Sequence, residues 1–212
     1  MRVISFDGNV YTGKTTLIRF LSDNYGYVSV DEHSLFIDGV PQRSFYKSEY
    51  LNLQDRYLSV DTYRKSFLQT GVNLLDRSFV SVSAHVFALY ELGLADIREA
   101  YFDLLKKKIE EIIFPNVFVW VRCGYNISRA RCLSVNNRKE TEDIYLSNKY
   151  FESIEKFNAK WALAVGGCVI NTESNPTDLW CSSIHDKIFK NPGTNLNGKI
   201  VTLDNIRRCM NL

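Results

Sequence analysis

The chain has 212 residues, of which 45% are hydrophobic and 24% charged, with a formal net charge of +2. This balance excludes the strong basic field typical of proteins that bind nucleic acid polymers, and no apolar run is long enough to span a membrane. Five cysteines form no CxxC pair, so we expect reduced thiols. The first predicted strand begins at once and leaves no room for a signal peptide, so we expect a cytoplasmic protein, in the host cytoplasm if viral.

The first predicted elements are a strand over Arg2–Phe6 and a helix from Gly13 to about Tyr25. The segment between them matches the GxxxxGKS/T pattern of a phosphate-binding loop, in the strand, loop and helix context that the loop requires. Its glycines let backbone N–H groups surround a phosphate, while Lys14 reaches the β/γ-phosphates and Thr15 ligates Mg²⁺. The predicted nucleotide-binding residues are Gly8, Asn9, Val10, Tyr11, Thr12, Gly13, Lys14, Thr15 and Thr16.

Further short strands alternate with segments long enough for helices. Strands are predicted at 27–30, 72–75, 117–121 and 168–170. This order indicates an α/β protein with the three-layer P-loop NTPase fold, in which helices cover both faces of a five-stranded parallel sheet. Two long helices are predicted over 92–113 and 143–161, and a last short segment over 202–210 follows a loop after Asn191.

An acid and a base follow the strand predicted at 72–75. Because the carboxyl ends of parallel strands form the ligand crevice of an open sheet, we expect Asp76 and Arg77 beside the phosphate-binding loop. Asp76 would hold Mg²⁺ directly or through water, and Arg77 would neutralise a substrate oxygen or the transferred phosphoryl group. The alternative is a structural ion pair at a strand end.

A basic segment follows the strand predicted at 117–121. Arg129, Arg131 and Arg138 predict an arginine-rich lid, over about 127–143, that closes on a triphosphate and stabilises the charge developing on the transferred group. The alternative is the solvated face of a helix.

The order of these features resembles the deoxynucleoside kinase family and its relative, thymidylate kinase, over roughly the first 160 residues. The residues that carry the resemblance, besides the phosphate-binding loop and the arginine lid, are Asp31-Glu32, Gln54 in an aromatic-flanked helix, Asp76-Arg77-Ser78, Ser81 and His85-Val86-Phe87-Ala88. The length predicts a single domain, which the resemblance identifies as a P-loop kinase domain over 1–212 with a tail over about 191–212. The resemblance also implies ATP as donor, Mg²⁺ as cofactor and a homodimer.

The resemblance also implies roles for individual residues. Glu32 would take the proton from a sugar 5′-hydroxyl, although Asp31 beside it competes for that role. Tyr46 would meet the 3′-hydroxyl and Gln54 would hydrogen-bond the base, unless Gln54 faces solvent from its helix. Arg77 would contact the acceptor. The chain departs from the family at Asp61 and Val82, where some nucleoside kinases keep an Arg and an Asp that tune base choice, and this leaves the base open.

These observations favour transfer of the γ-phosphoryl group of ATP to the 5′-hydroxyl of a deoxynucleoside. The first alternative is a kinase for thymidylate or another nucleoside monophosphate, and the second is a non-catalytic protein that binds a nucleotide at its P-loop. A GTPase is disfavoured because no guanine-reading Asn-Lys-x-Asp motif follows the fourth predicted strand. In each case the partner is a small nucleoside or nucleotide, and neither a nucleic acid polymer nor a membrane is expected.

Overall fold

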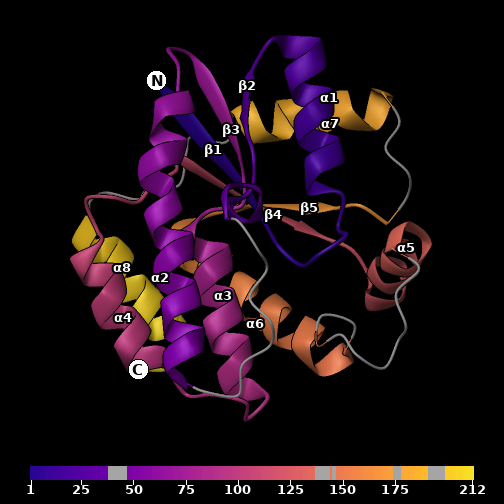
Figure 1. Ribbon diagram of the computed structural model, residues 1–212. Coiled ribbons are helices and arrows are strands. Elements are labelled where there is room, and N and C mark those ends of the chain that lie inside the picture. The colour runs from indigo at the N-terminus through magenta and orange to yellow at the C-terminus, as the bar shows by residue number, and fades with distance from the viewer. Residues whose placement is uncertain (38–46, 137–143, 145–146, 174–177, 191–198) are drawn as a thin grey trace.

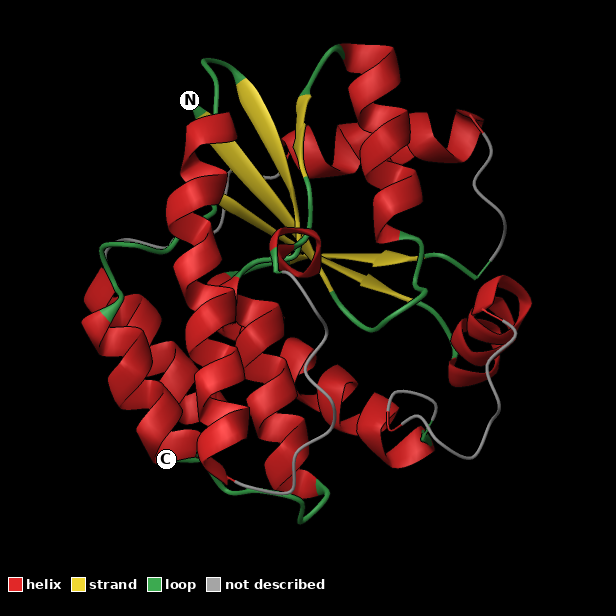
Figure 2. Cartoon of the chain, viewed as in Figure 1, coloured by secondary structure: helices red, strands yellow, loops and turns green. Residues whose placement is uncertain are grey.

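The structure is a computed structural model, and it describes residues 1–37, 47–136, 144, 147–173, 178–190 and 199–212 (Figure 1). Five parallel strands form one sheet in the order β2-β3-β1-β4-β5 (Figure 2). Their bounds are β1 Arg2–Asp7, β2 Val28–Val30, β3 Val72–Asp76, β4 Val117–Arg122 and β5 Cys168–Asn171. The five-stranded parallel sheet predicted from the sequence is confirmed.

The central strand β1 determines where ligands can bind. Its neighbours are β3 and β4, so the chain leaves β1 toward one edge of the sheet and later returns to build the other edge. A crevice opens outside the carboxyl ends of the strands where the order reverses in this way. The segment that follows β1 is the phosphate-binding loop, which therefore lies at this crevice.

Two helices pack on one face of the sheet, α1 (Lys14–Tyr25) and α7 (Asp178–Lys190) (Figure 1). Leu17, Ile18 and Leu21 of α1 are buried in one core with every second residue of the strands, for example Val119 and Val121 of β4. The intervening Phe118 and Trp120 belong to the core on the opposite face. Because successive strand side chains point to opposite faces, the continuous apolar run in β4 shows that both faces are covered.

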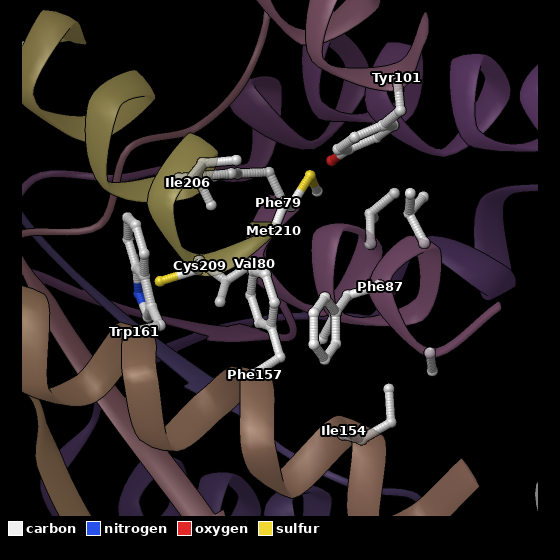
Figure 3. Close-up of a cluster of buried hydrophobic side chains, with 14 of the residues drawn as sticks. Phe79, Val80, Phe87, Tyr101, Ile154, Phe157, Trp161, Ile206, Cys209 and Met210 are labelled. Atoms are coloured by element: carbon white, nitrogen blue, oxygen red, sulfur yellow. The ribbon is translucent and has the colours of Figure 1, made fainter. Parts of the chain in front are cut away.

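The larger core lies on the other face, where α3 (Phe79–Glu91), α6 (Asn148–Val165) and α8 (Lys199–Cys209) meet. Figure 3 shows side chains of the three helices meeting in this cluster, among them Phe87 of α3, Phe157 of α6 and Ile206 of α8. The fully buried residues Phe79, Phe87, Phe157 and Trp161 form its centre. Each large apolar side chain buried in this way stabilises the fold by about 1.5–3 kcal/mol relative to exposure.

Five elements remain. They are the short 3₁₀ helices η1 (His33–Phe36) and η2 (Lys65–Phe67), and the helices α2 (Lys47–Arg64), α4 (Arg98–Lys107) and α5 (Tyr125–Asn136). Of these, η1, α2 and α5 line the crevice. Helix α2 packs against the larger core and ends with Arg64 at the carboxyl ends of β2 and β3.

Two predicted helices have wrong bounds. The helix expected over 92–113 is only α4, because Gly93 adopts a left-handed conformation (φ 71°) just after α3 ends, and turns replace helix after Lys107. The helix expected over 143–161 is α6, which begins after its N-cap Ser147 and continues to Gly166, where a left-handed residue ends it. The final segment, expected from residue 202, begins at Lys199.

Candidate active site

The phosphate-binding loop depends on two glycines. Gly8 has a φ of 137°, and a Cβ at this position would lie 2.2 Å from the carbonyl oxygen of Val121. Gly13 adopts a φ of 91° immediately before α1. Side chains at these positions would be strained or would collide with the end of β4, so the loop can take this path only with glycine. The N-terminus of α1 therefore opens onto the crevice, where its dipole favours an anion.

Lys14 lies inside the loop that precedes it. Its side chain is buried, and its Nζ donates to the carbonyl of Asn9 at 2.6 Å and to the hydroxyl of Thr12 at 3.4 Å. Burial, together with the nearby charge of Arg77, lowers the pKa of Lys14 to about 7. In this environment the Lys14 amine lacks a full counter-charge, and an anionic ligand would supply it.

Asp76 and Thr15 form a pair beside the loop. The Thr15 hydroxyl donates to Asp76 Oδ2 at 2.5 Å, while the buried Asp76 Oδ1 has no hydrogen-bond partner among the described residues. A hydroxyl and a carboxylate with a spare buried oxygen are ligands that suit Mg²⁺. These two residues therefore fit a magnesium ion.

Glu32 and Arg77 meet across the crevice. Arg77 Nε donates to Glu32 Oε2 at 2.8 Å, and its Nη1 donates to the carbonyl of Gly8 at 3.2 Å. Burial disfavours the charge of Glu32, but Arg77 and the hydroxyl of Ser34, which donates at 2.6 Å, outweigh it and lower the pKa of Glu32 to about 2. Glu32 is therefore ionised at neutral pH and faces a permanently charged guanidinium.

Arg77 occupies an unusual backbone conformation, with a φ of 66°. Such a conformation costs free energy in a non-glycine residue, so the surrounding structure must hold it. Asp7, fully buried at the end of β1, supplies part of this support by accepting hydrogen bonds from the backbone N–H and hydroxyl groups of both Ser78 and Ser81. The sequence analysis missed Asp7. Its position immediately before Gly8 was the available signal.

A cavity of about 930 Å³ connects these groups. One end is lined by the phosphate-binding loop, Asp76 and Arg77. The other end lies between α2, α3 and α6 and is lined by Gln54, Tyr57, Val82, His85 and Tyr150. Two ligands bound end to end in this cavity would place a phosphate chain at one end and a planar ring at the other.

Gln54 is buried at the far end of this cavity, with 1% of its surface exposed. Its Nε2 donates to the carbonyl of Tyr50 at 3.2 Å, and its Oε1 is buried without a hydrogen-bond partner in the described part of the chain. The alternative that Gln54 faces solvent is wrong. A buried polar atom without a partner is costly, and a ligand with a hydrogen-bond donor would satisfy it. Tyr46, expected nearby, lies outside the described residues.

His85 and Tyr150 complete this end of the cavity. The Nδ1 of His85 lies 3.0 Å from the Tyr150 hydroxyl. Burial and the charge of Arg77 lower the pKa of His85 to about 4, so its ring is neutral at physiological pH. With Val82 beside them, these side chains make this end of the cavity uncharged and suited to a nucleobase.

The predicted lid arginines are placed differently from one another. Arg131 lines the cavity, and its guanidinium donates to the carbonyls of Tyr11 at 3.4 Å and Thr172 at 2.9 Å. Arg129, two positions earlier on α5, does not line it, because residues two apart project from different sides of a helix. Arg138 lies outside the described residues.

Thr172 is a further residue that the sequence analysis missed. It follows β5, and its hydroxyl donates to the carbonyl of Thr12, while its backbone N–H donates to the carbonyl of Arg122 at 2.8 Å. Thr172 thus ties the phosphate-binding loop to the ends of β4 and β5. No local motif marks such a residue, because its partners come from distant segments.

Comparisons with known proteins agree with this geometry. A model of the family described as deoxynucleoside kinase matches residues 4–191. No curated protein sequence matches the chain. Among solved structures, deoxyadenosine kinase from M. mycoides with bound dCTP superposes with a TM-score of 0.64 at 15% identity, covering 89% of this chain and 99% of that one. Thymidylate kinase from Candida albicans gives a TM-score of 0.60 at 13% identity, covering 90% and 92% of the respective chains.

The structural similarity, at such low identity, establishes the fold and confirms that it is the P-loop kinase fold. The family model spans nearly the whole described sheet and the crevice at its carboxyl end. This chain therefore belongs to the deoxynucleoside kinase family.

Proposed function

We propose that the chain transfers the γ-phosphoryl group of ATP to the 5′-hydroxyl of a deoxynucleoside. Family membership makes it a nucleoside or nucleotide kinase. The observation that carries the finer proposal is the ion pair between Glu32 and Arg77, 2.8 Å apart, between the phosphate-binding loop and the uncharged end of the cavity. A carboxylate at this point suits an acceptor that must lose a proton.

Glu32 acts as the base in this proposal. Its low pKa makes it a weak base, so the proton moves late, when the 5′-oxygen has begun to bond to phosphorus and has become acidic. The O–P bond forms as the bond between the γ-phosphorus and the bridging oxygen breaks, the proton passes to Glu32, and ADP leaves. This order suits the loose transition state of phosphoryl transfer.

The loop and its neighbours hold the donor. The backbone of Gly8–Thr16 and the Lys14 amine bind the β/γ-phosphates, and Arg131, together with Arg138 of the predicted lid, stabilises the transferred group. Thr15 and Asp76 hold Mg²⁺, which when bound neutralises charge on the phosphate oxygens. Arg77 contacts the acceptor end, Gln54 orients the base and Tyr46 meets the sugar.

The monophosphate-kinase alternative fits the charges less well. An acceptor phosphate would need Arg77, yet Arg77 Nε already donates to Glu32 and its Nη1 to the Gly8 carbonyl. The phosphate would also lie beside the negative charge of Glu32, which repels it. A hydroxyl acceptor does not require Arg77 to leave its partners, and it brings no negative charge next to Glu32. The non-catalytic alternative leaves this charged pair without a role.

The experiment is a phosphorylation screen of the common deoxynucleosides and their monophosphates with ATP and Mg²⁺. We expect product from at least one nucleoside, and Glu32→Gln to lower kcat by about 10²-fold or more while ADP still binds. Asp31→Asn is the matched control, since it changes the adjacent exposed carboxylate. Activity confined to monophosphates would overturn the proposal. Loss of activity only in Asp31→Asn would move the base by one residue.

The location of the enzyme and its oligomeric state are also proposals. None of the helices in the described ranges combines the length and apolar character needed to cross a bilayer. We propose a cytoplasmic enzyme that acts on small nucleosides and forms a homodimer. Light scattering of the purified protein tests the homodimer, and a mass equal to one chain would exclude it.

A further inference from the structure

Arg64 is a completely buried arginine that the proposed mechanism does not use. It ends helix α2 and does not line the cavity. Its Nε donates to the carbonyl of Asp31 at 2.9 Å, and its Nη2 donates to the carbonyls of Asp76 at 3.1 Å and Arg77 at 2.9 Å. One side chain thus holds the backbone of two residues proposed to act in the reaction and of the residue that precedes Glu32.

These three carbonyls lie just beyond the paired part of β2 and β3. The ladder between the two strands stops at Val30, which pairs with Leu75. The residues that follow this pair, Asp31 after β2 and Asp76 at the end of β3, both have their carbonyls bound by the Arg64 guanidinium. Arg64 therefore continues the connection between the strands past their last pair, at the point where Glu32 and Arg77 must face each other.

The charge of Arg64 is balanced within the protein. Asp61, one turn earlier on α2, accepts from Arg64 Nη1 at 2.8 Å and from the backbone N–H of Ile113 at 2.9 Å. His33 Nε2 lies 2.9 Å from the same Arg64 nitrogen and 3.1 Å from Asp61. Asp61, which the sequence analysis considered for base choice, is fully buried here and does not line the cavity.

A buried ion pair contributes little net stability compared with apolar side chains of similar size, because removing both charges from water is costly. The geometry of this pair is nevertheless specific, since each guanidinium nitrogen has a partner and three partners are carbonyls beside the reaction centre. A planar fork of donors can fix several backbone groups at once, and a lysine cannot.

From this arrangement we propose that Arg64, supported by Asp61 and His33, is a positioning residue for phosphoryl transfer. This proposal rests on the proposed function. Arg64 sets the separation at which the Glu32 carboxylate and the Arg77 guanidinium meet the acceptor. Misplacing reacting groups by about 1 Å costs on the order of 10²-fold in rate.

The test compares Arg64→Lys with Lys65→Met. Lys65 is the next residue, and it donates to the carbonyl of Glu110, away from the cavity. For Arg64→Lys we expect kcat to fall on the order of 10- to 100-fold, while the KM for ATP and the affinity for ADP stay close to the wild-type values. Lys65→Met should keep the wild-type kcat. A folded Arg64→Lys enzyme with the wild-type kcat would overturn the proposal.

Two further measurements keep the test decisive. If Arg64→Lys does not fold, the double variant Asp61→Asn/Arg64→Gln takes its place, because it removes both buried charges. We expect this double variant to fold and to show the same loss of kcat. A folded double variant with unchanged kcat overturns the proposal. A crystal structure of the folded variant gives a readout that does not need turnover. The distance between Glu32 Oε2 and Arg77 Nε should exceed its present 2.8 Å, and an unchanged distance refutes the positioning role even if the wild-type acceptor proves to be a monophosphate.

Discussion

Asp7 and Ser78, 71 positions apart in the sequence, are joined by two hydrogen bonds of 2.9 Å, from the Ser78 backbone N–H and from its hydroxyl. This contact ties the strand that leads into the phosphate-binding loop to the turn that carries Asp76 and Arg77. The donor side and the acceptor side of the crevice therefore share one buried carboxylate.

Asp7→Ala should destabilise the protein and slow it. The substitution leaves the buried backbone N–H and hydroxyl of Ser78 without their acceptor, at a cost of about 1–3 kcal/mol for each buried group left unsatisfied. The turn that holds Arg77 at positive φ also loosens, so kcat should fall about tenfold or more. Denaturant unfolding and steady-state kinetics measure the two effects. Ser5→Ala is the control, because this buried hydroxyl on the same strand has no hydrogen-bond partner in the described structure. Equal effects of the two substitutions would contradict the role of Asp7.

Lys14→Met should abolish transfer without unfolding the chain. Methionine keeps most of the side-chain volume, and the lost amine is one whose charge is disfavoured by burial, so stability should not fall. Turnover should drop by about 10²-fold or more because charge on the transferred phosphate is no longer stabilised. Lys107→Met, on the exposed side of α4, controls for loss of a positive charge. Near-normal turnover in folded Lys14→Met would refute the assignment of the loop.

Nucleotide binding should take up a proton above pH 7. The pKa of Lys14 is about 7 in the free protein, so above that pH the amine is mostly neutral. Bound phosphates raise its pKa, and the amine must then gain a proton, so the affinity for ADP falls as the pH rises from 7. Calorimetry at pH 8 in buffers of different ionisation enthalpy measures the uptake. Lys14→Met should show no such uptake, and its absence in the wild type would contradict the prediction.

Gln54→Ala should weaken nucleoside recognition selectively. If the unpaired Oε1 meets a donor on the base, its loss costs about 1–3 kcal/mol, or roughly 5- to 150-fold in the KM for the nucleoside, with little change in the KM for ATP. Asn52→Ala, an exposed position on the same helix, is the matched control. An unchanged KM for every nucleoside would show that Gln54 does not read the base.

Local features of the chain determined most of the fold. The strands fall within one or two residues of their predicted bounds, because short apolar runs bounded by turn residues reflect backbone preferences that act over a few positions. The phosphate-binding loop was recognisable for the same reason, since the glycines that allow its path and the lysine that serves it are adjacent in sequence. Helix ends at Gly93 and Gly166 were missed, although they too are local.

The tertiary structure alone decided how the site is assembled. The sequence offered Glu32 and Arg77 as separate candidates, but their ion pair joins residues 45 positions apart and exists only because β2 and β3 end side by side. Arg64 resembles an ordinary surface charge in the sequence, yet it is completely buried. Burying a charge is costly unless specific partners satisfy it, and those partners are brought together by packing between distant segments, which no local pattern encodes.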